Sequence, residues 1–295
     1  MYVVMSATGN IGNKLANILL DKGEKVRVIG RSSERLAPFI GRGAEAAVGD
    51  VSDAEFLTNT FRGVDAVFAL IPPNYAADDF RAEYNTVGAS ITKAIQESGI
   101  KHVVFLSSVG AELPENTGVI KGLRDVEQQL NKLVGVNILH LRPTYFMENL
   151  LANIGMIKNM GINGGDIRGD VKFAMIATKD IAPVAADHLV KKDFSGKAVH
   201  ELLGERDVSM HEVTKIFGKK IGQPDLQYVQ FSAEDAKKGM LDSGISADVS
   251  DQLLELGQAI NDGLIAVNQS RTAENTTSTS IEEFADFFAQ VYESS

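Results

Sequence analysis

The stretch MYVVMSATGNIGNKLANILL, residues 1–20, contains the pattern that decides the fold. A short apolar run, Tyr2–Met5, leads into Ser6-Ala-Thr-Gly-Asn-Ile-Gly12, and a segment with helical periodicity follows at Leu15, Ile18 and Leu19. A strand, a glycine-containing turn and an amphipathic helix, in this order, are the setting in which a chain binds the pyrophosphate of a dinucleotide. The alternative is an ordinary strand-to-helix turn whose glycines are incidental.

The positions of this turn have separate physical roles. Gly9 lets the backbone approach a phosphate, and Gly12 lets the new helix pack closely on its strand. The helix N-terminus offers free N–H groups and a partial positive charge. Ser6 replaces the glycine that normally makes the tight turn, and we expect it to do so with a negative φ. The cofactor contacts expected here are Ser6, Thr8, Gly9, Asn10, Ile11 and Gly12.

Strand-like runs alternate with helical patterns through the first half of the chain. The apolar, β-rich runs are Tyr2–Met5, Lys25–Ile29, Ala66–Leu70, His102–Leu106 and Asn137–Leu141. Strands that alternate with helices form βαβ units, and these build a parallel sheet covered by helices on both faces. The sequence therefore predicts an α/β fold with a doubly wound parallel sheet.

Arginines at the end of the second strand indicate which dinucleotide is bound. Arg31 lies about 20 residues past the glycines, where an NAD site normally has an acidic residue for the ribose 2′-hydroxyl. A guanidinium, with Arg35 and two serines close behind, suits a 2′-phosphate instead. NADP(H) is therefore favoured over NAD(H). The alternative is a solvated basic helix start.

Further cofactor contacts are expected at the carboxyl ends of the other strands, where open α/β sheets bind ligands. Asp50 can accept a hydrogen bond from an adenine amino group, or it can cap the helix expected over 54–61. Leu70 and Ile71 form an apolar wall against adenosine. Ser107 ends the fifth strand and Pro143 follows the sixth.

The pattern changes after Pro143. Glycines crowd residues 161–169, which predicts a long loop, and residues 198–203 are typical of a strand that returns to the core. Helices are expected over 209–221 and 233–243, and a capping-box spacing at Ser280 precedes a last amphipathic helix. We therefore predict a dinucleotide-binding domain over residues 1–150 and a smaller substrate-binding region over residues 151–295.

Composition excludes several other classes of protein. A net charge of −10 argues against a nucleic-acid partner, and no apolar stretch approaches the length of a membrane span. The absence of cysteine excludes disulfides and thiolate metal sites and fits a reducing cytoplasm. The five histidines have no metal-ligand spacing, so no metal site is predicted. The expected partner is a small-molecule substrate, and a homodimer stays open.

Several motifs together resemble the NmrA-like family of atypical short-chain dehydrogenase/reductases. The residues that match are Ala7–Gly12, Gly49-Asp50, Phe105–Ser108 and, most specifically, Leu141–Asn149, which reads LRPTYFMEN. The resemblance spans nearly the whole chain. It implies a Rossmann domain with a small C-terminal domain, and an NAD(P) site between them. The family includes NADPH-dependent quinone, azo and phenylpropanoid reductases, together with NADP-sensing regulators that have lost catalysis.

The catalytic pair of active short-chain dehydrogenases, a Tyr with a Lys four residues later, is incomplete in this chain. If Lys121 is the family lysine, Thr117 replaces the tyrosine. If the family glutamate is Glu127, then Val119 and Leu123 stand at the two positions, and we prefer this register. Lys121 and Tyr145 are the remaining candidates for a catalytic role, against a solvated lysine and a half-buried wall residue as the alternatives.

Strong acceptors such as quinones and azo compounds can take their proton from water, so their reduction does not require the missing tyrosine. The first hypothesis is therefore an NADPH-dependent reductase of a small conjugated acceptor. The second is a catalytically silent, NADP(H)-sensing regulatory protein. A sugar epimerase or dehydratase ranks third, because such reactions depend more on the lost pair.

Overall fold

A parallel sheet forms the centre of the protein in the computed structural model, which describes residues 1–265 and 267–295. Within these residues the sheet has seven strands, and every neighbouring pair is parallel. The strand order switches sides between β1 and β4, which places a crevice at their carboxyl ends. In spatial order the strands are β10 (Lys197–Leu202), β6 (Asn137–Pro143), β5 (His102–Leu106), β4 (Ala66–Ala69), β1 (Tyr2–Val4), β2 (Val26–Gly30) and β3 (Glu45–Val48).

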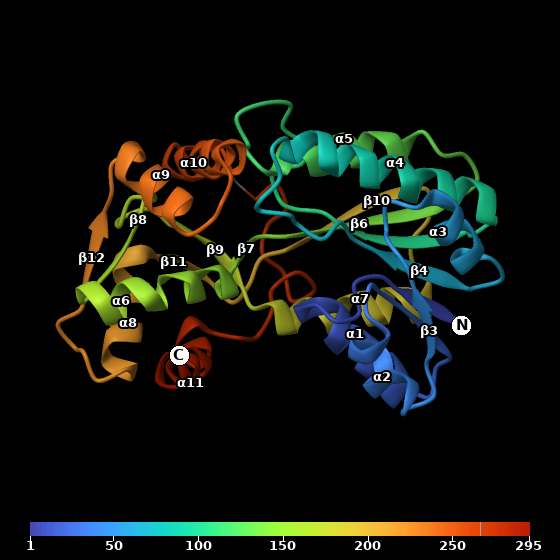
Figure 1. The fold of residues 1–295 in the computed structure, drawn as a ribbon, viewed down its shortest axis with the longest axis horizontal. Helices are drawn as coiled ribbons and strands as arrows, with labels where there is room; N and C mark the ends of the chain where they lie inside the picture. The colour runs from blue at the N-terminus through green and yellow to red at the C-terminus, as the bar shows by residue number, and fades with distance from the viewer. Residues whose placement is uncertain (266) are drawn as a thin grey trace.

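Helices cover both faces of this sheet, as Figure 1 shows. One face carries α1 (Asn10–Asp21), α2 (Ser33–Ile40) and α7 (Thr178–Lys191), and the other carries α3 (Ala54–Phe61), α4 (Phe80–Ser98) and α5 (Ile120–Asn131). Leu15 and Leu19 belong to the apolar core of the first face, and Ile91 and Leu130 belong to that of the second. The sheet is therefore buried between two helical layers, which explains its continuous apolar strands.

The doubly wound α/β fold predicted from the sequence is confirmed. The five expected runs correspond to β1, β2, β4, β5 and β6, with bounds that differ by at most two residues at either end. β3 is the strand that the list of expected runs lacks. It is an exposed edge strand with a weak apolar pattern, so its sequence EAAV carries little strand signal.

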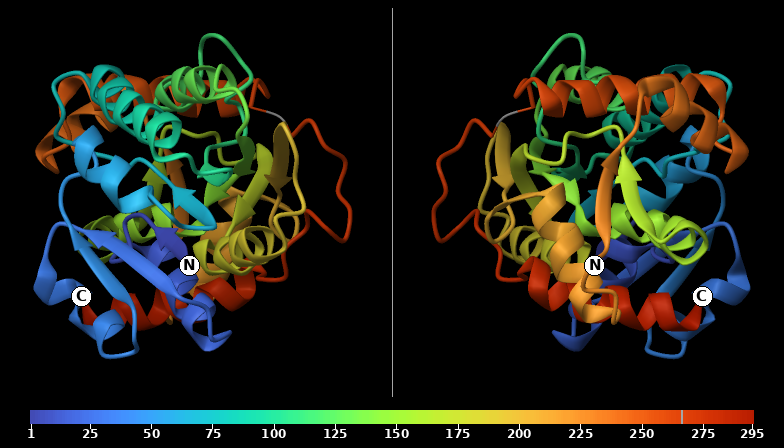
Figure 2. Two further views of the ribbon diagram at one scale, coloured as in Figure 1. Left: turned by 90° about the vertical axis from the view of Figure 1, so that its right-hand side faces the viewer. Right: turned by 90° about the vertical axis from the view of Figure 1, so that its left-hand side faces the viewer.

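The rest of the chain packs around a third apolar core beside the sheet, and Figure 2 gives two further views of it. Phe217 and Phe288 stack at 4.0 Å in this core. The helices and strands of this part of the chain are β7 (Tyr145–Phe146), the 3-10 helix η1 (Met147–Asn153), α6 (Ile154–Met160), β8 (Ile162–Gly165), β9 (Lys172–Ile176), β11 (Asp207–Ser209), α8 (Met210–Lys220), β12 (Gln227–Gln230), α9 (Ala233–Asp242), α10 (Ala247–Asn261) and α11 (Ile281–Ser294).

Two expectations for this part of the chain are wrong. The glycine-rich stretch 161–169 is not a continuous loop, because β8 lies within it and pairs in parallel with β12. This strand needs a glycine at position 164, because a Cβ there would lie 2.6 Å from the ring of Phe231. Helix α10 was also not expected. Ser246 caps it by accepting a hydrogen bond from the Val249 N–H.

The division of the chain at residue 150 stays a prediction. β10 pairs in parallel with β6, with Ala198 opposite Leu139, and α7 packs against α1. Residues beyond 150 thus contribute one strand and one helix to the sheet layer. The last helix begins where its capping signal lies, with Ser280 accepting from the Glu283 N–H. None of the helices among the described residues is both long and apolar enough to span a membrane.

Candidate functional site

The glycine turn joins β1 to α1, and the Ala7 N–H within it donates to the Ile29 carbonyl oxygen at 3.1 Å. Ser6 has a φ of 51°, in the left-handed region, so the expectation of a negative φ is wrong. Its carbonyl oxygen accepts the Gly9 N–H at 2.9 Å. A Cβ on Gly12 would lie 2.4 Å from the same oxygen, so the turn excludes every larger residue there. Gly9 is the N-cap of α1 and supplies no side chain, which leaves the first turn of the helix open to a phosphate.

Arg31 and Arg35 lie beside this turn, at the end of β2. Arg31 is exposed, and Arg35 donates from its guanidinium to the Thr8 carbonyl at 3.4 Å. The two arginines therefore come from a segment that also contacts the glycine turn. This arrangement brings two cations to the place where the second ribose of a dinucleotide lies in such folds.

Asp50 follows β3 and makes a local turn. Its carboxylate accepts hydrogen bonds from the N–H and the hydroxyl of Ser52, at 2.8 and 2.7 Å. These bonds, with a smaller effect of the Arg31 charge, hold the pKa of Asp50 below its ordinary value. The alternative role of Asp50 as a helix cap is wrong, because Asp53 caps α3. Its role toward a cofactor stays a prediction.

A cavity of about 710 Å³ opens at the carboxyl edge of the sheet. It reaches from the glycine turn past the ends of β4, β5 and β6 to residues of the third core. Nine of the expected cofactor contacts line it, namely Ser6, Gly9, Asn10, Ile11, Gly12, Leu70, Ile71, Ser107 and Pro143. Thr8, Arg31, Arg35 and Asp50 do not line this cavity. The volume lies in the range of cofactor and ligand sites.

The start of α5 forms an apolar wall of this cavity. Val119, Ile120 and Leu123 line it, whereas Lys121 does not. The Lys121 ammonium lies 2.6 Å from the Glu255 carboxylate and so joins α5 to α10. Thr117 is fully buried and also lies outside the lining. The register that places Val119 and Leu123 at the Tyr and Lys positions therefore puts both of those side chains at the cavity.

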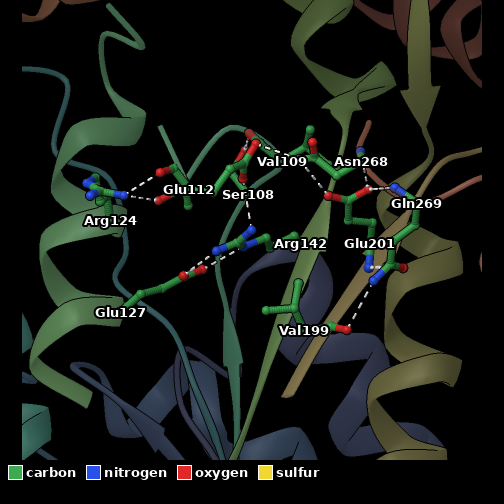
Figure 3. Close-up of polar contacts among 11 residues, drawn as sticks. Ser108, Val109, Glu112, Arg124, Glu127, Arg142, Val199, Glu201, Asn268 and Gln269 are labelled. Carbon is green, nitrogen blue, oxygen red and sulfur yellow. Dashed lines mark hydrogen bonds and ion pairs between the residues drawn. The ribbon is translucent and has the colours of Figure 1, made fainter. Parts of the chain in front are cut away.

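A buried ion pair fastens α5 to the end of β6. The Nε and Nη2 of Arg142 donate to the Glu127 carboxylate at 2.9 and 2.6 Å, and Nη1 donates to Glu112 at 2.8 Å (Figure 3). Burial acts to lower the pKa of Arg142, but the hydrogen bonds and charge of Glu127, together with the charges of Glu112 and Glu201, outweigh it and keep the pKa above its ordinary value. The pair holds the strand end that carries Pro143.

Glu201 of β10 stands opposite Arg142 in the strand register and binds the segment that follows α10. Its carboxylate accepts the backbone N–H groups of Asn268 and Gln269, at 2.8 and 2.9 Å (Figure 3). The Asn268 side chain also donates to Glu112. These contacts hold the segment at the cavity, where Val267 is part of the lining.

Aromatic side chains form part of the cavity lining. Tyr145 and Phe173 meet edge to face at 5.5 Å, and Phe80 lies 4.5 Å from Tyr84, measured between ring centroids. Burial, with the nearby Asp166 charge, raises the pKa of Tyr145, so its side chain is a neutral phenol at physiological pH. Phe173 lies in the predicted substrate-binding region but is not among the residues predicted for the site.

Two residues of the cavity lining carry a buried hydroxyl group without a hydrogen-bond partner among the described residues. Ser107 follows β5 and is 4% exposed, and Thr144 follows β6 and is 9% exposed. Neither hydroxyl oxygen has a partner among the described residues. A buried polar group without a partner costs free energy. Thr144 is not among the site residues predicted from the sequence.

The structure is that of a Rossmann-like α/β protein with a cavity at the carboxyl edge of its sheet. Comparison with protein-family models identifies the family. The model of the NmrA-like family matches residues 2–285, and the chain belongs to that family. The resemblance seen in the sequence motifs is thereby confirmed.

Three known proteins illustrate the relationship. The (4-alkanoyl-5-oxo-2,5-dihydrofuran-3-yl)methyl phosphate reductase of Streptomyces griseus is 29% identical over 241 residues, which cover 82% of this chain and 80% of that protein. The NADPH-dependent quinone oxidoreductase of Escherichia coli, solved with NADPH, has a TM-score of 0.82 at 20% identity and covers 97% of this chain and 99% of its own. The triphenylmethane reductase of Citrobacter, solved with NADP(H), has a TM-score of 0.80 at 20% identity, covering 98% and 100%.

Proposed function

We propose that the chain is an NADPH-dependent oxidoreductase that reduces a small conjugated acceptor, quinone-like or azo-like, by hydride transfer. The observation that carries this proposal is the continuous cavity, which runs from the phosphate-binding turn at Gly9 and Gly12 to the aromatic wall at Tyr145. The reductases similar to this chain, whose names state quinone, dye or dihydrofuranone substrates, support the same class of reaction.

The residues at the cofactor end fit NADP(H). The open first turn of α1, with no side chain on Gly9 at its N-cap, lets a pyrophosphate approach the backbone, and the exposed Arg31 suits a 2′-phosphate. The unpartnered Ser107 hydroxyl adds a hydrogen-bonding group at the strand end. NADPH supplies a hydride from its nicotinamide ring when it is bound. The chain binds and orients it beside the acceptor.

The acceptor end restricts the chemistry to acceptors that need no protein acid. Val119 and Leu123 stand where the family's Tyr and Lys are expected, and neither side chain exchanges a proton. A carbon–carbon double bond conjugated with a carbonyl, as in the dihydrofuranone named for the Streptomyces griseus relative, accepts a hydride and takes its proton from water afterwards. Aromatic walls provide the flat apolar surface that such planar acceptors need.

The test is to titrate the purified chain with NADPH by calorimetry and then to follow NADPH oxidation at 340 nm with a panel of quinones, azo dyes and unsaturated lactones. We expect binding of NADPH and turnover with at least one conjugated acceptor. Binding without oxidation above background across the panel contradicts the reductase proposal.

The second candidate is an NADP(H)-sensing regulatory protein, and the apolar pair Val119 and Leu123 is the observation that favours it. It predicts cofactor binding without turnover, together with a change in oligomeric state or conformation when the cofactor binds. Size-exclusion chromatography with and without NADP⁺ measures this change. The sugar epimerase alternative has less support, because it depends on the missing pair. A cytoplasmic location and a homodimer stay predictions.

A further inference from the structure

Two exposed apolar side chains mark where the cavity meets solvent. Of the lining residues that the structure describes, Tyr75 and Val267 are the large hydrophobic ones that are also exposed, at 47% and 37%. A residue that lines a cavity and is also exposed lies at its mouth. Tyr75 belongs to the loop between β4 and α4, and Val267 belongs to the segment after α10. Tyr75 supplies the larger flat surface of the two.

The Tyr75 ring is the outer member of a row of three aromatic side chains. It lies nearly parallel to the Phe80 ring, with 12° between the planes and 6.4 Å between the centroids, and Phe80 in turn packs on Tyr84 at 4.5 Å. All three residues line the cavity, but Phe80 and Tyr84 are buried. Tyr75 is therefore the member of the row with free ring surface at the mouth.

The Tyr75 phenol also lies near that of Tyr145. Burial raises the pKa of Tyr145 most, and the nearby charges of Asp166 and Tyr75 add to this rise. Tyr145 packs edge to face on Phe173, and both line the cavity. Aromatic groups from the loop after β4 and from β7 and β9 thus meet in one part of the lining.

Contacts with the start of α10 hold the loop that carries Tyr75. The Tyr75 carbonyl accepts the Ser246 N–H at 2.9 Å, and the Ala77 carbonyl accepts the Ser246 hydroxyl at 2.6 Å. The Phe80 N–H donates to the Asp248 carboxylate at 2.9 Å. An aromatic ring on a fixed backbone loses little conformational freedom when a ligand covers it. Tyr75 is therefore preorganised to contact a ligand at the mouth of the cavity.

We propose that Tyr75 is a specificity-determining residue whose ring stacks on the flat face of the acceptor. This inference rests on the proposed reductase function and narrows its substrate class to acceptors with a planar conjugated ring, as opposed to open-chain or puckered unsaturated carbonyl compounds. Stacking of two rings contributes affinity beyond the apolar area that it buries. A saturated ring of the same size buries a similar area without this contribution, so Tyr75 discriminates between the two.

The experiment uses calorimetry to measure binding of 2-naphthol and of decahydro-2-naphthol to the full chain in excess NADP⁺. The two probes have the same carbon skeleton and hydroxyl group, but only the first is planar and aromatic, and neither requires turnover. We expect Tyr75→Leu to weaken 2-naphthol binding about threefold to tenfold and decahydro-2-naphthol binding less than about twofold. Tyr75→Phe keeps the ring and should keep the 2-naphthol affinity.

Phe287→Leu is the matched control. Phe287 lies on α11, is 46% exposed and is outside the cavity lining, so the same aromatic-to-leucine change is made at nearly the same exposure. It should change the affinity for neither probe. Both leucine variants should keep a melting temperature close to that of the wild type, because both rings are half exposed. A purely structural role of Tyr75 does not predict a loss confined to the aromatic probe.

Three results would overturn the proposal. They are a wild-type chain that does not bind 2-naphthol in the presence of NADP⁺, equal losses for both probes in Tyr75→Leu, and an unchanged 2-naphthol affinity in that variant. Oxidation of NADPH by 1,4-naphthoquinone is measured separately, and Tyr75→Leu should raise its KM more than it changes kcat. If turnover by the wild type is absent but the naphthol result holds, the reductase function fails and the aromatic contact stands.

Discussion

The two ends of the cavity are built by different means. At the cofactor end the backbone sets the geometry, because Ser6 takes a left-handed φ of 51° and Gly12 has no room for a Cβ. At the acceptor end side chains set the geometry, through the apolar Val119 and Leu123 and the ion pair of Glu127 with Arg142. Backbone geometry of this kind tolerates little change, whereas side chains on a fixed helix are replaced freely. If the chain lacks a proton donor, as proposed above, this difference explains how the glycine turn is kept while the acceptor end changes.

The largest expected effect on stability comes from removing the ion pair between Glu127 and Arg142 at the acceptor end of the cavity. Glu127→Ala leaves Arg142 buried with only the half-exposed Glu112 as a charged partner, and we expect a loss of about 3–5 kcal/mol in the free energy of unfolding. Chemical denaturation of the full chain measures it. Glu115→Ala, at an exposed position before α5, is the control and should change stability by less than about 0.5 kcal/mol. Equal effects of the two variants would contradict this account.

A smaller effect on stability is expected from a substitution in the glycine turn at the cofactor end of the cavity. Gly12→Ala places a methyl group 2.4 Å from the Ser6 carbonyl oxygen, so the turn must shift. We expect a loss of about 1–3 kcal/mol in stability and a marked loss of NADPH affinity by calorimetry. Gly155→Ala, in α6, meets nothing within 4 Å and is the control. Full NADPH affinity in Gly12→Ala would show that the turn does not bind the cofactor.

The smallest effect is expected from Lys121→Gln. The ammonium is paired with Glu255 rather than aimed into the cavity, and both side chains are partly exposed. We expect a loss of less than about 1 kcal/mol in stability, with NADPH affinity and turnover unchanged. A large fall in kcat at unchanged stability would instead assign Lys121 the catalytic role that its sequence position suggested.

The sequence predicted the fold well because the signals for the fold are local. Strand periodicity, the glycine turn and the Ser280 cap each act within a few residues, and the structure has all three. The left-handed φ of Ser6 escaped prediction because a serine rarely takes that conformation. Strand β8 was missed because it owes its place to pairing with the distant β12. Non-local pairing leaves little trace in local composition.

The candidate site was predicted only in part for the same reason. The turn and the strand ends are contiguous in sequence, so nine expected contacts line the cavity. Phe173 and Val267 join that lining from far along the chain, by the packing of β9 and by the hold of Glu201 on the segment after α10. Thr144 was missed because its place in the lining is apparent only from the structure.

The central claim is that the chain binds NADP(H) with Arg31 at the 2′-phosphate, and one titration tests it most directly. Calorimetry compares NADP⁺ and NAD⁺ binding to the wild type and to Arg31→Asp. The account predicts that Arg31→Asp lowers NADP⁺ affinity at least about tenfold, because it removes a charge-assisted pair and adds repulsion, while NAD⁺ affinity changes much less. Equal losses for the two dinucleotides, or no binding of either by the wild type, would contradict the claim.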